Sequence, residues 1–483
     1  MCCRLAHCSD PACPSRPRTL SPAAELSVAL PGWLIGWDAF AFIGHRRFAR
    51  HWSVPAIRDE LLDTYRIELS PDAISLYIQR YQNMVAARQQ DLDRLRLAYQ
   101  GIDCVDLTID GLQPEKGHET LYAVRELKAK RVWFAEALLS SNEAEVRRLL
   151  VRAGEMAKQL GKPIRVWMSD KQDAFVKGIA AEFSGIPHLY CGNHFLRDLA
   201  KPTLAGDSHA KVKMRKKVRG LRGIEREVLQ RRQEAETGAE RAGGVVLDYC
   251  AAVRGILNDD QGGALHPPGL RMAEALTEVR ESVQRNLELD KPGPEHGQLG
   301  RLAVCIDRGL GEVKAEQQEV KEQVEEIRRV AETLDVESGT REQRKEKYEG
   351  LQRQYEGKGG EFYERLAKVM LAWAAGLFLK VERTQGEGSP VDNLELERFF
   401  RNPKGHERRI HGHKHAGVRI VQEGPTLLMA LDAHLGHDGP FSAEELLPYR
   451  HARAPKDQEE AIGRRKVMRK ARSKKNDQPC SKS

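Results

Sequence analysis

Between residues 100 and 200, apolar and polar residues follow two distinct periods. In the segment 105–110 every second residue is apolar, and Asp106, Thr108 and Asp110 lie between the apolar ones. A period of two predicts a β-strand whose two aspartates share one face. The segments TLYAVREL and VWFAEALL, separated by the polar turn KAKR, predict two further strands.

Helical periodicity then alternates with short apolar runs. The segments NEAEVRRLLVRAGEMAKQLG and QDAFVKGIAAEFSG have apolar residues at helical spacing and are closed by Gly161 and Gly185. IRVWMSD, which ends in Asp170, and HLYC predict short strands. The resulting order β-β-β-α-β-α-β is typical of an α/β fold, in which helices pack on a sheet.

The segment 31–95 predicts two helices separated by a short turn. VPAIRDELLDTY is amphipathic, and the helix after it starts with Ser70 as N-cap and Pro71 at its first position. Such a pair is typical of a helix-turn-helix, whose second helix enters the major groove of DNA. A plain helical hairpin gives the same pattern, so both interpretations stay open.

Residues 205–385 have helical periodicity and no strand pattern. We expect a helical insertion that serves in dimerisation or in clamping DNA. A 4-3-4-3 spacing predicts a short coiled-coil seam, which consists of Val320, Val324, Ile327, Ala331 and Leu334. A second apolar helical face consists of Leu366, Val369, Met370, Trp373 and Leu377.

These patterns divide the chain into six regions. They are a Cys-rich leader at 1–30, a helix-turn-helix region at 31–95, the first part of an α/β core at 100–200, the helical insertion at 205–385, the last part of the core at 386–445, and a basic, disordered tail at 450–483.

Charge adds a hint about partners. The net charge of the 483-residue chain is +8, and cations cluster at Arg46–Arg50, Lys211–Arg232, Arg401–Lys414 and Arg464–Lys475. Such clusters suit phosphate contacts, although a run of charge is usually a solvated face. No run of eighteen apolar residues exists, so no membrane span is expected.

The cysteines are concentrated at the start of the chain. Four of the nine lie within the first thirteen residues, which does not indicate a disulfide framework and favours a reducing, cytoplasmic setting. Cys8 and Cys13 lie at the edge of known zinc-ligand spacing. One interpretation is a zinc site at these residues. The alternative is a leader whose cysteines occur by chance and bind no metal. Further candidate ligands are Cys3, His7, His45 and His51.

Two strand-end aspartates are candidates for chemistry. Asp110 lies on the first strand and Asp170 ends the fourth. In a β-β-β-α-β sheet these strands can be neighbours, and the two carboxylates would then converge. Hard oxygen ligands on a rigid sheet suit Mg²⁺, and metal ions held there promote phosphodiester chemistry. Each aspartate alone could equally be a turn former or a helix cap.

A third carboxylate comes from the stretch DNLELERFFRNPKGHERRIHGHKH, residues 392–415. Asp392 and Glu395 have local explanations as helix-capping groups. Glu397 has none apart from a pair with Arg401 one turn on, although its neighbours are apolar and a carboxylate there is costly unless paired or bound to metal. We expect the helix to end at Pro403 and Gly405.

Together these segments resemble the three acidic motifs of the DDE transposases of bacterial insertion sequences, which use an RNase H-like fold. IDG contains Asp110, SDKQDAF contains Asp170, and DNLELERFFRNPKGHERRIHG contains Glu397. CGNH, from Cys191 to His194, resembles the C-x-x-H of Mutator-like transposases. The positions of the last motif that match are Asn393, Leu396, Glu397, Phe399, Phe400, Arg401, Lys404, Arg408, Arg409 and Gly412.

Two departures keep alternatives open. The usual asparagine doublet before the glutamate reads Asp392-Asn393, and its spacing to Glu397 is one residue longer than in the family. Glu395 is therefore an alternative third ligand. Asp106 is an alternative to Asp110, which we prefer because a glycine follows it.

The resemblance implies an activity and its partners. Asp110, Asp170 and Glu397 would bind Mg²⁺ or Mn²⁺ for cleavage at element ends and for strand transfer into target DNA. The helix-turn-helix would read terminal inverted repeats, and a homodimer or higher oligomer would assemble on DNA in the bacterial cytoplasm, at the nucleoid. The expected DNA-contacting cations are Arg46, Arg47, Arg50, Arg401, Lys404, Arg408 and Arg409.

Two other functions share part of this pattern. A helix-turn-helix regulator without catalysis explains the basic clusters and the helical half, but leaves Asp110, Asp170 and Glu397 without a role. An RNase H-like nuclease that cuts without strand transfer uses the same acids.

Overall fold

The computed structural model describes most of the chain. The described residues are 7–14, 16, 23–113, 119–234, 239–289, 294–381, 392, 394–412, 419–456, 458–460, 462–464 and 467. The chain forms two compact units. We call Met1–Cys191 with Leu379–Ser483 the sheet unit, and Gly192–Phe378 the helical unit. Asn393, which matches the last motif, lies outside the described residues, as do His413 and His415.

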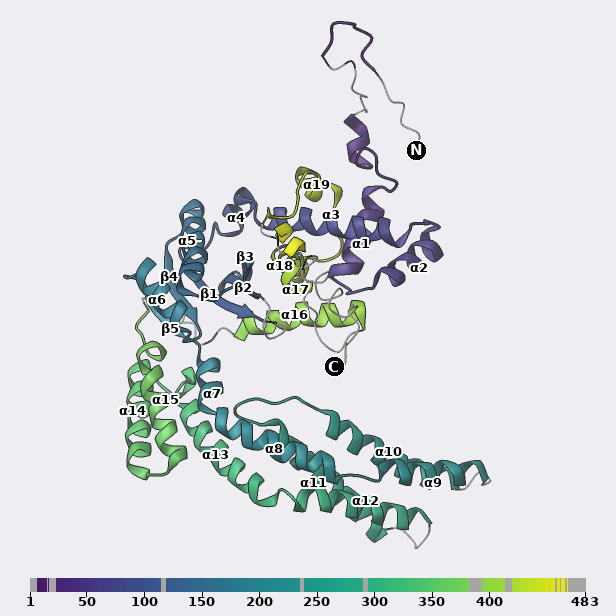
Figure 1. Cartoon of the computed structure of the whole chain (residues 1–483), viewed down its shortest axis with the longest axis vertical. Coiled ribbons are helices and arrows are strands. Elements are labelled where there is room, and N and C mark those ends of the chain that lie inside the picture. The colour runs from purple at the N-terminus through teal and green to yellow at the C-terminus, as the bar shows by residue number, and fades with distance from the viewer. Residues whose placement is uncertain are drawn as a thin grey trace, which may run out of the picture. The chain divides into compact units, whose positions relative to one another are not determined.

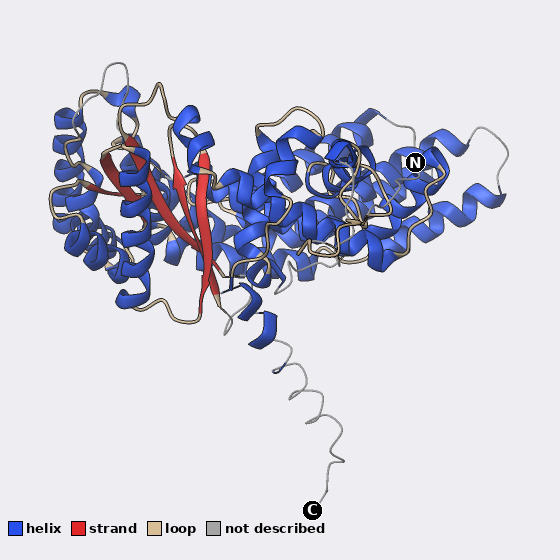
Figure 2. Cartoon of the chain, turned by 90° about the horizontal axis from the view of Figure 1, so that it is seen from above, coloured by secondary structure: helices blue, strands red, loops and turns tan. Residues whose placement is uncertain are grey.

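The sheet unit contains one five-stranded mixed sheet, drawn in red in Figure 2. The strand order is β3-β2-β1-β4-β5; β2 is antiparallel to β1 and β3, while β1, β4 and β5 are parallel. The predicted α/β class and the order β-β-β-α-β-α-β are confirmed. The strands are β1 (Val105–Leu112), β2 (Thr120–Glu126), β3 (Arg131–Leu138), β4 (Ile164–Ser169) and β5 (His188–Tyr190).

One face of the sheet is covered by helices from the segment between residues 92 and 182. The alternating residues Val105, Leu107 and Ile109 are fully buried there. Asn142 caps the longest of these helices, and Gly161 ends it in the left-handed conformation at φ +67°, as predicted. The helices are α4 (Leu92–Ala98), α5 (Glu143–Leu160) and α6 (Asp173–Glu182).

The opposite face is covered by helices from both ends of the chain. Leu112, Leu121 and Ala123 share a core there with residues of the covering helices. The covering helices are labelled in Figure 1. Asp106, Thr108 and Asp110 alternate with the buried apolar set and therefore lie on this face. The helices are α3 (Pro71–Gln89), α16 (Leu394–His411), α17 (Arg419–Gln422) and α18 (Gly424–Leu435).

The prediction that Pro403 and Gly405 end the last-motif helix is wrong. Helix α16 continues through both residues to His411, and Pro403 is buried inside it. A proline in a helix interior removes one backbone hydrogen bond at a cost of about 3 kcal/mol. Burial of Leu396 and Phe399 before Pro403 and of Ile410 after it offsets that cost.

The segment 31–95 does not have a core of its own. Its helices share one hydrophobic core with Leu427, Leu431, Phe441 and Leu446 from the C-terminal part of the chain. Ser70 caps α3 through the backbone N–H of Ala73, and Pro71 is its first residue, as predicted. The remaining elements of this core region are the 3₁₀ turns Ala23–Ser27 and Leu447–Tyr449, and α1 (Trp37–Phe48), α2 (Val54–Tyr65) and α19 (Ala443–Leu446).

The start of the predicted disordered tail packs against this unit. The buried Gln458 accepts a hydrogen bond from the backbone N–H of Thr426 on α18 at 3.3 Å. The residues after 467 lie outside the described part of the chain.

The helical unit, where the structure describes it, is built from helices, with one isolated β-bridge between Gly263 and His266. The described residues of the predicted insertion, 205–385, are thus mainly helical, and the helical unit to which most of them belong begins earlier, at Gly192. Its elements are α7 (Gly192–Leu199), α8 (Lys201–Lys217), α9 (Leu221–Glu234), α10 (Ala239–Asn258), α11 (Pro268–Leu289), α12 (Pro294–Gly311), α13 (Lys314–Glu332), the 3₁₀ turn Val336–Ser338, α14 (Arg341–Lys358) and α15 (Glu361–Leu377).

The predicted coiled-coil seam is covered inside this unit. Val320 and Val324 on α13 pack with Leu270 on α11, and Ile327 is fully buried. A seam that is already packed within the chain cannot pair two copies, so its expected role in dimerisation does not fit this structure.

Among the described residues, every helix is too short or too polar to cross a bilayer.

Candidate active site

Asp110 and Asp170 meet near the carboxyl ends of the neighbouring strands β1 and β4. In the parallel pairing of β1 with β4, Thr108 lies opposite Met168. Two residues further along both strands this register brings Asp110 opposite Asp170. The carboxylate oxygens of the two residues lie within 4.8 Å of each other, so the convergence that the sequence predicts is present.

The local backbone fixes both carboxylates. Asp110 is 8% exposed, and its Oδ1 accepts a hydrogen bond from the Gly111 N–H at 2.7 Å. A Cβ at Gly111 would lie 2.8 Å from Thr120 Cγ2, so β2 leaves room only for glycine after Asp110. Asp170 Oδ1 accepts from the Gln172 N–H at 2.9 Å, just before α6. Asp170 therefore also has the local turn-forming role that was the alternative to a site role.

Glu397 is directed to the same strand ends. A carboxylate oxygen of Glu397 on α16 lies within 4.8 Å of the Cys191 Sγ. The Cys191 N–H donates to the Ser169 carbonyl at 2.9 Å, which places Cys191 beside the residue that precedes Asp170. Helix α16, packed on the face of the sheet that carries Asp110, thus brings a third carboxylate to the edge where β4 and β5 end.

The two neighbouring acids of α16 have other partners. The Asp392 carboxylate accepts from the Leu394 N–H at 2.9 Å and so caps the helix start. Glu395 pairs with Arg398 at 3.6 Å, and its side chain is 43% exposed. This geometry favours Glu397 over Glu395 as the third site carboxylate.

Asp106 is likewise occupied by an ion pair. The Arg165 guanidinium donates to both of its carboxylate oxygens, with Nε 2.8 Å from Oδ1. Both side chains are buried, at 4% and 7% exposure. A carboxylate neutralised in this way is a poor candidate for a metal ligand, so the geometry favours Asp110 over Asp106.

The donor set fits a hard divalent cation. Two carboxylates within 4.8 Å repel each other when both are ionised, and a cation between them removes that repulsion. Asp110 and Asp170 offer oxygen ligands, which Mg²⁺ prefers. Glu397 adds a third carboxylate next to the softer thiol of Cys191.

The cations predicted to contact DNA differ in their exposure. Arg50, Arg401, Arg408 and Arg409 are exposed, and Lys404 is half-buried. Four of these five lie on α16, the helix that carries Glu397.

Arg46 and Arg47 have packing roles. The Arg46 guanidinium lies over the rings of Phe42 and Trp52, at 4.6 and 5.1 Å from their centroids. Arg47 is 3% exposed and donates to the Trp52 carbonyl at 3.1 Å, and burial lowers its pKa to about 10. The expectation that Arg47 contacts DNA therefore does not fit this structure, because phosphate cannot reach a buried guanidinium.

Among the residues that the structure describes, the candidate zinc ligands are not gathered in one place, and Cys3 lies outside those residues. Cys8 and Cys13 are half-buried, and within the described part of the chain no cluster of three metal-ligating groups includes either of them. His45 is buried in α1, and His51 Nδ1 lies 2.9 Å from His406 Nδ1. Both histidines belong to the interior of the sheet unit, which explains them without a metal.

Helix α3, the expected recognition helix, has two different halves. From Tyr81 to Gln89 it is mostly buried, because it packs against α18 and shares hydrophobic cores with the C-terminal helices. In its first half Asp72, Ser75, Leu76, Gln79 and Arg80 are exposed. Only this N-terminal half is available to another molecule, and that is the half by which recognition helices touch bases.

Sequence reasoning missed a group of histidines that pack inside the sheet unit, of which His406 is buried and His434 half-buried. His406 and His434 stack on Phe48, and the Tyr81 hydroxyl lies 3.0 Å from His434 Nε2. Burial lowers the pKa of His406 to about 2 and that of His434 to about 3. The stretch after Glu397 is rich in histidine, but its local pattern does not show that His406 is buried.

The comparisons with known proteins add no family: no protein-family model matches the chain, and no curated protein matches it. The interpretation of the site therefore depends on the geometry of Asp110, Asp170 and Glu397.

Proposed function

We propose that this protein is a metal-dependent DNA transposase of the DDE type with an RNase H-like core. The observation that carries the proposal is the meeting of Asp110 and Asp170 on neighbouring parallel strands, within 4.8 Å. The strand order β3-β2-β1-β4-β5 and the packing of Glu397's helix on the same face support it.

Each part of the site has a defined task in this proposal. Asp110, Asp170 and Glu397 hold Mg²⁺ or Mn²⁺, and a bound divalent ion supplies Lewis acidity for attack on a phosphodiester. The sheet keeps Asp110 and Asp170 fixed relative to each other, and Gly111 lets β2 pack closely behind them. The exposed Arg401 and Arg408 on α16 bind backbone phosphates beside Glu397.

Other parts of the chain would serve DNA recognition. The exposed N-terminal half of α3, after the short turn that follows α2, is the part of the proposed helix-turn-helix that reads element ends. Pairing of two ends requires an oligomer, and its interface must lie elsewhere than in the packed seam of Val320 and Val324.

The test is a cleavage and joining assay. Purified protein is incubated with Mg²⁺ or Mn²⁺ and with DNA that carries the ends flanking its own coding sequence. We expect cleavage and joining by the native protein, and loss of both in Asp110→Ala, Asp170→Ala and Glu397→Ala. Unchanged activity in all three variants would overturn the proposed site.

The same assay separates the two other functions. Specific end binding without cleavage or joining would indicate a helix-turn-helix regulator. Cleavage that needs the three carboxylates but yields no joined product would indicate an RNase H-like nuclease.

A further inference from the structure

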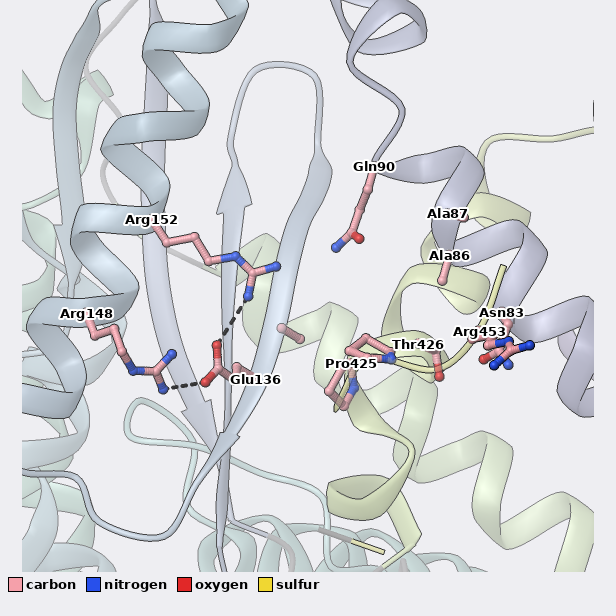
Figure 3. A pocket seen from close by; sticks show the side chains of 12 residues that line it. Asn83, Ala86, Ala87, Gln90, Glu136, Arg148, Arg152, Pro425, Thr426 and Arg453 are labelled. Atoms are coloured by element: carbon pink, nitrogen blue, oxygen red, sulfur yellow. Dashed lines mark hydrogen bonds and ion pairs between the residues drawn. The ribbon is translucent and has the colours of Figure 1, made fainter. Parts of the chain in front are cut away.

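A polar cavity lies at the free edge of the sheet, beside strand β3. Its volume is about 310 Å³. Figure 3 shows Glu136 with Arg148 and Arg152 on one side of it, and residues of α3, α18 and the C-terminal segment on the other. All of its lining residues belong to the sheet unit. The cavity is therefore a feature of that unit alone.

The lining of the cavity is cationic. Arg148, Arg152 and Arg453 carry three positive charges, and Glu136 is the one carboxylate among the lining residues. Glu145 also contacts Arg148, at 3.3 Å, from outside the cavity. Even with both carboxylates counted, a positive charge is left over. The neutral polar groups that line the cavity are Asn83, Gln90 and Thr426.

Two of the arginines are held in place before any ligand arrives. Glu136 is 6% exposed and accepts from Arg148 through Oε1 and from Arg152 through Oε2, the latter at 3.2 Å. The Arg152 guanidinium also lies over the Phe134 ring, 4.2 Å from its centroid. A guanidinium has five N–H donors, so one bond to Glu136 leaves most of the Arg152 donors for a ligand. Fixed forks of this kind match phosphate oxygens.

We propose that this cavity binds a phosphate group of the DNA backbone. Arginine forks and neutral polar groups line it together with alanines and prolines, and none of its lining residues is aromatic. A site for a free nucleotide would need a surface on which the base can stack, whereas a backbone phosphate needs only donors and charge.

The position of the cavity agrees with this ligand. Gly111, which follows Asp110, lies opposite Tyr122, and Tyr122 lies opposite Glu136. The backbone of Glu136, which lines the cavity, is therefore two strand spacings, or about 10 Å, from that of Gly111 across the sheet. That the phosphate belongs to DNA rests on the proposed function, whereas the affinity of the cavity for phosphate does not.

Arg453 gives the cleanest test. It is exposed, and it makes no ion pair with any residue that the structure describes. Arg453→Gln therefore removes a charge without leaving Glu136 unpaired. A second variant, Glu136→Gln with Arg152→Gln, removes a cation together with its carboxylate. The matched control is Arg450→Gln, which removes an exposed arginine three residues away that does not line the cavity.

Binding is measured on the full chain in EDTA by fluorescence anisotropy, with a labelled DNA duplex of arbitrary sequence, at several salt concentrations. We expect Arg453→Gln and the double variant to weaken binding roughly tenfold, the size of one charge-assisted hydrogen bond. The slope of log affinity against log salt should fall by about one for each lost phosphate contact. Arg450→Gln should do neither.

The outcomes separate this inference from the proposed function. Affinities and salt slopes of both cavity variants equal to those of Arg450→Gln would overturn the inference, even if cleavage is found. If both cavity variants bind DNA more weakly and the native protein shows no cleavage, the result would support the phosphate site and would contradict only the proposed transposase function. A third measurement uses ³¹P spectra of inorganic phosphate with the native protein and with Arg453→Gln. If the native protein broadens the phosphate line, Arg453→Gln abolishes the broadening, and duplex binding is unchanged, then free phosphate is the ligand and DNA is overturned as its source.

Discussion

The sheet unit and the helical unit differ in how deeply their ion pairs are buried. In the sheet unit, Arg125 and Asp432 form a buried pair at 3.3 Å, with both side chains 5% exposed. In the helical unit most ion pairs lie at the surface; Arg301 and Glu227, for example, are 51% and 41% exposed. A buried exception there, Asp207, accepts the N–H groups that start α11 and so has a structural role.

This difference indicates where chemistry can take place. Burial of a charge costs free energy unless a partner, a hydrogen bond or a metal compensates it. The helical unit keeps most of its ion pairs at the surface and is held together by apolar faces. The sheet unit buries the charged pairs Arg165–Asp106 and Arg125–Asp432. Under the proposed function, the carboxylates of Asp110 and Asp170 have a catalytic role rather than a packing one.

The sharpest test of this comparison uses two glutamates of one helix. Glu397→Gln removes a carboxylate directed to the strand ends, whereas Glu395→Gln removes one that is 43% exposed and paired with Arg398. We expect Glu397→Gln to lower the rate of DNA cleavage by about a thousandfold or more, the order found when one electrostatic group is removed from an active site. Glu395→Gln should change the rate less than about threefold.

Single-turnover rates measured with both variants decide between the glutamates. A large loss in Glu395→Gln with a small one in Glu397→Gln would assign the third site carboxylate to Glu395. Circular dichroism of both variants serves as the control for folding, because the two substitutions lie on the same helix.

The next prediction concerns the stability that the buried ion pair of Arg125 and Asp432 gives to the sheet unit. Burial raises the pKa of Asp432 to about 6 even though Arg125 and the Val132 N–H stabilise its charged form. Arg125→Met leaves that carboxylate uncompensated and should lower the stability of the sheet unit by about 3–5 kcal/mol. The double variant Arg125→Met with Asp432→Leu should recover most of the loss.

Hydrogen exchange followed peptide by peptide is the suitable measurement, because a chain with two units need not unfold in one step. Protection should fall in β2 and β3 and stay unchanged in α13. An equal loss of protection in both units would mean that they unfold together, and that the contrast between them has no thermodynamic counterpart.

The helical unit should respond to the loss of apolar volume. Ile327 on α13 is fully buried, and Ile327→Ala should lower the stability of this unit by about 2–4 kcal/mol. Leu371→Ala is the control, because Leu371 is 65% exposed and should contribute within about 0.5 kcal/mol. Protection should fall in α8, α11 and α13 for the first variant only, and a loss confined to the strands would contradict the division into two units.

Local periodicity made much of the sheet unit predictable. Alternation along residues 105–110 gives the strand and its faces without tertiary information. The separation of Asp110 and Asp170 by 60 positions equals the register offset between Thr108 and Met168 in β1 and β4. Capping chemistry at Ser70 and Gly161 gave a helix start and a helix end for the same reason, since caps act within a few residues.

What depends on distant contacts was not predictable. Pro403 predicts a helix end locally, and only packing of α16 on the sheet overrides it. Arg47 looks like a phosphate contact until the core that it shares with the C-terminal segment is known. The cavity beside Glu136 joins β3, α5, α3 and α18, and no window of sequence contains them together.

The smallest effect concerns the histidines that lie inside the sheet unit. Burial lowers the pKa of His51 to about 4 and that of His406 to about 2. Since the ordinary pKa of histidine is 6.5, the unfolded chain binds more protons than the folded one between these values. The stability of the sheet unit should therefore fall as the pH drops below 6.5, by about 1.4 kcal/mol per pH unit for each such histidine.

His406→Phe isolates one of these contributions. The phenyl ring keeps the stacking on Phe48 that His406 has, at 5.8 Å between ring centroids, and removes the nitrogen that bonds His51. Exchange protection in β1–β3, measured from pH 7 to pH 5, should depend less steeply on pH in this variant by about 1.4 kcal/mol per unit. The helical unit should show no such difference between the two proteins. An identical pH slope in the sheet unit of both would mean that His406 has the same pKa in the folded and the unfolded chain, and that burial does not lower it.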